Sequence, residues 1–260
     1  AYNVAISGDG NTAYVADEEF GLQIIDVSDR SNPALLSAFD TEGAAIGVAL
    51  SSNEEIAYVA DVYSLQIIDI SDPQSPNLLG SFTTSGTAYG VTISADGNSA
   101  YIAVDSAGLE IVDITNRADP LLVGTLDTPG LARAVQLSND GKTAYVTDDS
   151  YGLQIININD PANPDLLSNF DTEGSSWGLT LSADGNFAYV ADYSSLQVID
   201  ISDKASPRAM GEFSTAGPAY GVALSSDGNT AYIAEGSGLQ IIDATISNLA
   251  IGDEMPQVVT

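Results

Sequence analysis

The residues of this chain best suited to bind a ligand recur at one position of a repeated pattern. Steps of 43 or 44 residues separate six positions occupied by Tyr2, Ile46, Tyr89, Arg133, Trp177 and Tyr220. Trp177 is the only tryptophan of the chain, and Arg133 is the one cation among the six. Aromatic rings bind sugars and other polar molecules by stacking, and an arginine pairs with a carboxylate. The residue types therefore predict a ligand site formed by Tyr2, Tyr89, Arg133, Trp177 and Tyr220.

The same inventory argues against most catalytic chemistry. The chain contains no histidine and no cysteine, so it lacks Ser-His-Asp or Cys-His machinery, imidazole or thiolate metal ligands, and disulfides. Glycoside hydrolysis by two carboxylates stays open, with Glu42 and Glu173 or Asp40 and Asp171 as acid and base. A calcium-dependent hydrolase also stays open, although a calcium site needs about six to eight converging oxygens. We expect no catalytic residues, no metal ligands and no cofactor, with Ca²⁺ as the one ion left open.

The charge balance is strongly acidic. Asp and Glu number 36 against 6 Lys and Arg, which gives a formal net charge of −30. Such a surface repels nucleic acid and anionic membranes, because affinity for phosphate comes largely from clustered Lys and Arg. Solubility or adaptation to salt explains this composition more simply than a dedicated cation site. No segment approaches about 18 consecutive apolar residues, so we expect no membrane insertion.

Two sequence markers keep the same period as the candidate site. A-Y-[VI] places a tyrosine at Tyr14, Tyr58, Tyr101, Tyr145, Tyr189 and Tyr232, and L-[QE]-[IV]-[IV]-[DN] begins at Leu22, Leu65, Leu109, Leu153, Leu196 and Leu239. A fixed period of this length, built from short alternating runs, is typical of a β-propeller. We predict a single all-β domain over residues 1–260, a six-bladed β-propeller with four antiparallel strands per blade. The blades are expected at about residues 1–43, 44–86, 87–130, 131–174, 175–217 and 218–260.

Aspartates mark the turns between these strands. An Asp-Gly pair is expected to form a hairpin at Asp9, Asp96, Asp140, Asp184 and Asp227, whereas Asn53-Glu54-Glu55 predicts an irregular hairpin in the second repeat. The aspartates that end the third strand are expected to hold the following turn; they are Asp26, Asp69, Asp113, Asp200 and Asp243. The last fourth strand is expected within Ile246 to Thr260.

A longer period lies over the shorter one. Tyr14 and Tyr145 are 131 residues apart, and Asp40-Thr41-Glu42-Gly43 returns as Asp171-Thr172-Glu173-Gly174 at the same distance. The chain therefore reads as a duplicated three-blade unit with pseudo-twofold character. Arg133 and Trp177 belong to consecutive repeats and are predicted to be neighbours at the mouth of the central channel.

The run Leu22-Gln23-Ile24-Ile25-Asp26, repeated six times and followed in five copies by a proline, resembles the LVIVD repeat family. The fourth copy departs from the pattern with Asn157 in place of Asp. The resemblance implies a β-propeller of bacterial surface and secreted proteins, and it carries no catalytic residues. We predict a monomeric, non-catalytic binding or adhesion module, extracellular or on the bacterial cell surface. Its partner would be a glycan, a small polar molecule or another surface protein. A structural spacer in a larger surface protein is the main alternative, and a hydrolase is the second.

Overall fold

The structure is a computed structural model that describes residues 1–245, and these residues form β-strands and connecting turns. No helix among them could cross a membrane. The predicted fourth strand of the last repeat, within Ile246 to Thr260, lies outside the described residues.

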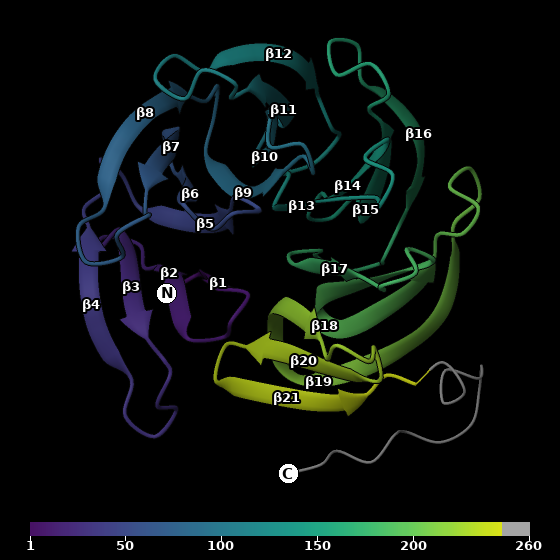
Figure 1. The fold of residues 1–260 in the computed structure, drawn as a ribbon. Coiled ribbons are helices and arrows are strands. Elements are labelled where there is room, and N and C mark those ends of the chain that lie inside the picture. Colours follow the sequence, from purple (N-terminus) through teal and green to yellow (C-terminus); the bar gives the residue numbers. More distant parts are fainter. Residues whose placement is uncertain (246–260) are drawn as a thin grey trace. The chain divides into compact units, whose positions relative to one another are not determined.

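The first three repeats each form an antiparallel sheet of four strands in sequence order (Figure 1). The first sheet contains β1 (Asn3–Ile6), β2 (Thr12–Ala16), β3 (Leu22–Asp26) and β4 (Ala34–Phe39). The second contains β5 (Ala45–Leu50), β6 (Ile56–Asp61), β7 (Ser64–Asp69) and β8 (Asn77–Thr83). The third contains β9 (Ala88–Ile93), β10 (Ser99–Val104), β11 (Gly108–Asp113) and β12 (Leu121–Leu126).

The last three repeats supply two sheets. One has four strands: β13 (Ala134–Leu137), β14 (Thr143–Thr147), β15 (Leu153–Asn157) and β16 (Asp165–Phe170). The other has five: β17 (Leu179–Leu181), β18 (Phe187–Asp200), β19 (Arg208–Leu224), β20 (Thr230–Glu235) and β21 (Gly238–Asp243).

The prediction of six separate blades is therefore wrong: residues 1–245 form five sheets. The difference arises at β19, which pairs with β18 through its first part and with β20 through its second. In the other repeats, the segment between the last strand of one repeat and the first strand of the next contains a glycine that is followed by a residue other than proline. Here the pair is Gly217-Pro218. Proline pushes the preceding residue toward extended geometry, so the strand continues through this point. The fifth and sixth repeats consequently share one sheet.

The hairpin between the first two strands of a repeat is set by side chains, as its Asp-Gly pair predicts. Asp9 Oδ1 accepts hydrogen bonds from Ser7 Oγ (2.6 Å) and from the Asn11 amide (2.9 Å), while Gly10 has a φ of 73°. The hairpin of the second repeat was predicted to be irregular, and this is wrong. Asn53 accepts from Ser51 Oγ (2.7 Å), and Glu54 takes the left-handed conformation with a φ of 58°. A different sequence therefore makes the same turn.

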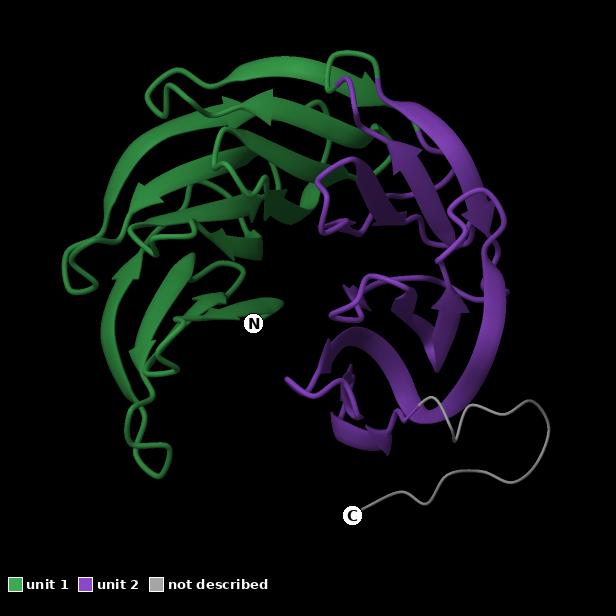
Figure 2. Cartoon of the chain, turned by 45° about the vertical axis from the view of Figure 1, so that its right-hand side comes forward, with its two compact units in different colours: residues 1–127, 161–163 green, residues 128–160, 164–260 purple. Residues whose placement is uncertain are grey.

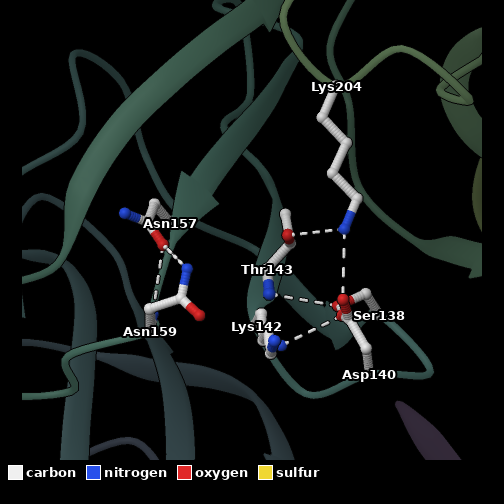
Figure 3. A network of polar contacts seen from close by, with 7 residues as sticks. All are labelled: Ser138, Asp140, Lys142, Thr143, Asn157, Asn159 and Lys204. Atoms are coloured by element: carbon white, nitrogen blue, oxygen red, sulfur yellow. Dashed lines mark hydrogen bonds and ion pairs between the residues drawn. The ribbon is translucent and has the colours of Figure 1, made fainter.

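The aspartate at the end of the third strand holds the next turn, which confirms the prediction for that position. Asp26 accepts from the Ser28 amide at 2.9 Å, and Asp200 accepts from the Ser202 amide at the same distance. In the fourth repeat Asn157 holds this turn, since its side-chain oxygen accepts a hydrogen bond from the Asn159 amide at 3.1 Å (Figure 3). The departure from the repeat pattern at this position keeps the turn.

The strands form two compact units, which are described separately (Figure 2). Unit 1 consists of residues 1–127 and 161–163, and unit 2 of residues 128–160 and those that follow 163. The main boundary, after Asp127, separates the three repeats that the 131-residue period relates to the other three. In each unit the faces of the sheets bury the tyrosines and branched aliphatic residues of the repeat markers; Tyr58 and Ile67 lie in unit 1, Tyr189 and Val198 in unit 2.

Neighbouring turns within unit 2 are also joined by polar contacts (Figure 3). Lys204 Nζ donates to Thr143 Oγ1 at 2.8 Å and lies 3.8 Å from Asp140 Oδ1. Asp140 also accepts from Ser138 Oγ (2.5 Å) and from the Lys142 amide (3.2 Å). One partly buried lysine thus connects the third turn of the fifth repeat to the hairpin of the fourth.

Candidate functional site

The segment that carries Trp177 is fixed by backbone hydrogen bonds to two repeats. The Ser176 amide donates to the Asp149 carbonyl (3.0 Å), and the Trp177 amide donates to the Ala191 carbonyl (2.9 Å). The Trp177 carbonyl accepts from the hydroxyl of Thr147 at 2.5 Å. Thr147 Oγ1 also accepts from the Ala134 amide (3.0 Å), next to Arg133. Because one buried hydroxyl bonds to both segments, the backbones of Arg133 and Trp177 are held in fixed register.

Arg133 lies over the indole of Trp177. Its Cζ atom is 4.6 Å from the ring centroid, within the range of a cation–π contact. Its Nη2 atom lies 3.5 Å from Asp149 Oδ2, and the arginine side chain is 11% exposed. The prediction that Arg133 and Trp177 are neighbours is confirmed. The guanidinium therefore lies between an aromatic face and a carboxylate, which together orient its plane.

Two tyrosines extend the aromatic cluster. Tyr220 meets Trp177 edge to face, with centroids 5.2 Å apart and planes at 89°. Tyr193 meets Tyr220 in the same manner at 6.2 Å and 87°. Tyr220 is 42% exposed and Tyr193 46%, so both present ring surface to solvent. The four side chains Arg133, Trp177, Tyr193 and Tyr220 are called the aromatic cluster below.

A glycine allows the backbone next to Trp177 to approach that of Tyr220. A Cβ atom on Gly178 would lie 2.7 Å from the Tyr220 carbonyl oxygen and 2.8 Å from the Gly221 Cα. Real Cβ atoms do not come this near to backbone, so only glycine fits without a shift. The close approach brings the two rings into contact.

Of the five predicted site residues, the structure brings Arg133, Trp177 and Tyr220 together. Tyr2 and Tyr89 belong to unit 1 and are not part of the aromatic cluster. Tyr2 is 59% exposed just before β1, and Tyr89 is partly buried in β9. The predicted channel mouth, which would join all five, stays a prediction.

Sequence reasoning missed Tyr193 and Thr147. Tyr193 lies within β18, at the place where the other repeats connect their second and third strands, and has a φ of 50°, rare for an aromatic residue. Thr147 stands where the other five repeats have alanine, at Ala16, Ala60, Ala103, Ala191 and Ala234. This one polar residue at a position that is otherwise alanine could have identified Thr147 from the sequence.

Buried carboxylates anchor the loops beside the cluster. Asp148 accepts from Thr128 Oγ1 (2.6 Å) and from the Gly130 amide (2.9 Å). Asp192 Oδ1 accepts from Thr172 Oγ1 (2.7 Å) and from Ser176 Oγ (3.2 Å). Burial raises the pKa of Asp192 above its ordinary value, against the lowering effect of these two hydroxyl hydrogen bonds. These carboxylates hold loops in place.

Within residues 1–245, no three acidic side chains are grouped so that they could hold a metal ion. The candidate acid and base pairs, Glu42 with Glu173 and Asp40 with Asp171, each take one residue from either unit. Calcium binding accordingly stays a prediction.

The strand pattern defines an all-β protein of the β-propeller class, and solved structures share this fold. The periplasmic gluconolactonase of Pseudomonas aeruginosa matches with a TM-score of 0.82 at 16% identity, over 100% of this chain and 84% of that one. A Lactobacillus plantarum protein also gives 0.82, at 15% identity over 99% and 86%. Kuenenia stuttgartiensis hydrazine synthase gives 0.76, at 18% identity over 94% and 83%. At these identities the likeness concerns the fold alone.

The sequence comparison is more specific. The LVIVD repeat matches six times, at residues 1–41, 42–84, 85–128, 129–172, 173–215 and 216–260. The chain therefore belongs to the LVIVD repeat family, as the repeated strand predicted. No curated protein sequence matches it significantly.

Proposed function

We propose that this protein is a non-catalytic binding module whose ligand contacts the aromatic cluster of unit 2. The observation that carries the proposal is the guanidinium of Arg133 lying 4.6 Å from the centroid of Trp177, beside partly exposed tyrosine rings. A cation stacked on an indole is held rigid, so it loses little entropy when it binds a partner. Following the family resemblance, we further propose that the module acts at the bacterial cell surface or outside the cell.

The chemistry of the cluster favours a polar molecule with one anionic group or a sugar ring. Tyr193 and Tyr220 offer ring surface for stacking, and Arg133 offers N–H donors to a carboxylate. The net charge of −30 disfavours polyanions, because their repulsion by the rest of the protein grows with each added charge. A neutral glycan or a singly charged acidic sugar therefore fits better than a polyphosphate.

Trp177 makes the test direct, since the chain has no other tryptophan. Neutral oligosaccharides, uronic acids and small carboxylic acids are titrated while Trp177 emission is followed, with and without calcium. Calorimetry then compares variants with any compound that binds. Arg133→Ala is expected to abolish binding of an anion and to spare a neutral sugar, whereas Trp177→Ala weakens both. Ile46→Ala, at the position of unit 1 equivalent to Trp177, is the matched control and leaves binding unchanged.

Two outcomes would overturn the proposal. If no compound in these panels binds, with or without calcium, the spacer function is preferred. If the protein hydrolyses a lactone, as the name of the Pseudomonas neighbour suggests for that protein, or a glycoside, the function is catalytic. Loss of that turnover in an Asp or Glu variant with intact folding would locate the centre.

A further inference from the structure

We propose that Thr172, Ser176 and Asp192 form a positioning cluster that holds Trp177 and Tyr193 in the binding geometry. This inference rests on the proposed function for its purpose, but its structural content can be tested without any ligand. The three side chains are almost fully buried, and none of them belongs to the aromatic cluster.

The cluster is compact and lies next to both aromatic residues along the chain. Thr172 Oγ1 lies 2.7 Å from Asp192 Oδ1 and 2.7 Å from Ser176 Oγ, which is itself 3.2 Å from Asp192 Oδ1. Ser176 directly precedes Trp177, and Asp192 directly precedes Tyr193. A single carboxylate oxygen therefore ties the start of the two segments that carry the rings.

The cluster is also connected to Arg133. The Ser176 amide donates to the Asp149 carbonyl (3.0 Å), and the Asp149 carboxylate lies 3.5 Å from Arg133 Nη2. The backbone of Ser176 is thus bonded to Asp149, and its hydroxyl to Asp192. A displacement of Ser176 would shift Trp177 relative to the guanidinium above it.

Unit 1 has the same framework without this arrangement. Its equivalent residues, 131 positions earlier, are Thr41, Ala45 and Asp61. Thr41 Oγ1 donates to the Gly43 carbonyl (2.9 Å), while Asp61 Oδ2 accepts from the Gly43 amide and from Gln66 Nε2, each at 2.9 Å. The loop of unit 1 therefore folds with its threonine bonded to backbone and no serine. Directing two hydroxyls to the carboxylate is a feature of unit 2, where the aromatic cluster lies.

Hydrogen bonds to a buried carboxylate are charge-assisted, and water cannot readily replace a donor that is lost there. Removing a hydroxyl donor leaves a desolvated carboxylate oxygen with fewer partners, which costs more than the loss of an exposed hydrogen bond. The loop can recover that free energy only by moving Asp192 or Ser176 toward water. Either movement separates Trp177 from Arg133 or Tyr220.

The experiment measures the ligand-free protein. Thr172→Val keeps the shape and removes the hydroxyl, Thr172→Ser keeps the hydroxyl, and Thr41→Val makes the valine change in unit 1. We expect Thr172→Val to shift Trp177 emission to the red and to raise its acrylamide quenching constant about twofold through local opening. Thr172→Ser restores wild-type values, and Thr41→Val leaves both unchanged.

Ser176→Ala covers the case in which Thr172→Val fails to fold, because unit 1 tolerates Ala45 at that position. It is expected to change Trp177 emission in the same direction. Wild-type emission and quenching in folded Thr172→Val or Ser176→Ala overturn the inference, and so does an equal change in Thr41→Val or a failure of Thr172→Ser to restore the signal. If the variants behave as expected but the protein binds no ligand, the inference on the positioning cluster stands and only the proposed function is rejected.

Discussion

Two stretches of this chain, 131 residues apart, share a backbone arrangement and differ in the side chains that it presents. In unit 1 an isolated β-bridge joins Glu18 to Ala45, and in unit 2 the equivalent bridge joins Asp149 to Ser176. The residue after the bridge is Ile46 in one unit and Trp177 in the other. The repeat thus supplies a fixed frame, and a few substitutions on it suffice to build an aromatic cluster in unit 2. Function on a repeated fold is to be sought where the copies differ.

The shared frame predicts equal sensitivity at a pair of glycines. A Cβ atom on Gly47 would lie 2.4 Å from the Tyr89 carbonyl oxygen, and one on Gly178 would lie 2.7 Å from that of Tyr220. Since backbone must move in both cases, Gly47→Ala and Gly178→Ala are each expected to lower the free energy of unfolding by about 3 kcal/mol. Urea unfolding measures both.

Gly97→Ala serves as the control, because nothing lies within 4 Å of its Cβ position although its φ is 72°. It is expected to cost less, about 1 kcal/mol, from backbone strain alone. A large loss at only one of Gly47 and Gly178 would show that the two units do not share the close approach.

The difference between the units predicts an effect confined to unit 2. Trp177→Ile installs the residue found at position 46 and removes the contacts of the indole with Arg133 and Tyr220. The loss is expected to be about 2 kcal/mol, the combined worth of one cation–π contact and one aromatic pair. Urea unfolding followed by circular dichroism gives the value.

A double-mutant cycle separates these contributions. Arg133→Met combined with Trp177→Ile should give a coupling free energy of about 1 kcal/mol between the two side chains. Strict additivity of the two single changes would show that the stacking contributes nothing to stability.

Two aspartates of unit 2 predict opposite pH dependences, one buried in β18 and the other in an exposed turn. Burial raises the pKa of Asp192, with Glu212 and Asp171 adding to the rise, whereas hydrogen bonds from Ser182 and Asn186 lower the pKa of Asp184. A raised pKa means that the folded state binds the proton more tightly, so Asp192 favours folding below pH 3.8 and this contribution is lost as pH rises through its folded pKa. Asp184 contributes above pH 3.8, and its contribution is lost as pH falls through its own lowered pKa.

Two asparagine variants test the direction of each pH dependence. The stability of Asp192→Asn relative to wild type should increase as pH rises above 3.8, and that of Asp184→Asn should decrease as pH rises toward 3.8. Urea midpoints measured across the acidic range at constant ionic strength give both trends. The same trend in the two variants would contradict the assignment of buried and exposed roles.

Much of this arrangement could be predicted from the sequence, because repetition fixes the period and each turn is set by nearby residues. The position of Trp177 beside Arg133 follows from equal places in consecutive repeats. The count of blades could not be obtained this way, since Gly217-Pro218 looks like a break but keeps β19 extended. The regular hairpin at Glu54 was equally unpredictable, because a left-handed glutamate takes the place that glycine has in the other repeats. Tyr193 joins the cluster through the pairing of β18 with β19, which spacing along the chain does not encode.

The smallest effect concerns one left-handed residue in each unit. Glu18 has a φ of 51° in unit 1 and Tyr193 a φ of 50° in unit 2. Glycine relieves about 1 kcal/mol of strain at either position and loses a similar amount through the greater freedom of the unfolded chain. Glu18→Gly should therefore leave stability nearly unchanged, whereas Tyr193→Gly should lower it by about 1 kcal/mol, because it also removes the ring contact with Tyr220. Chemical denaturation of both variants measures the difference. Equal stabilities would mean that the ring of Tyr193 contributes nothing to the stability of the free protein, and its backbone strain would then have to be offset by ligand binding alone.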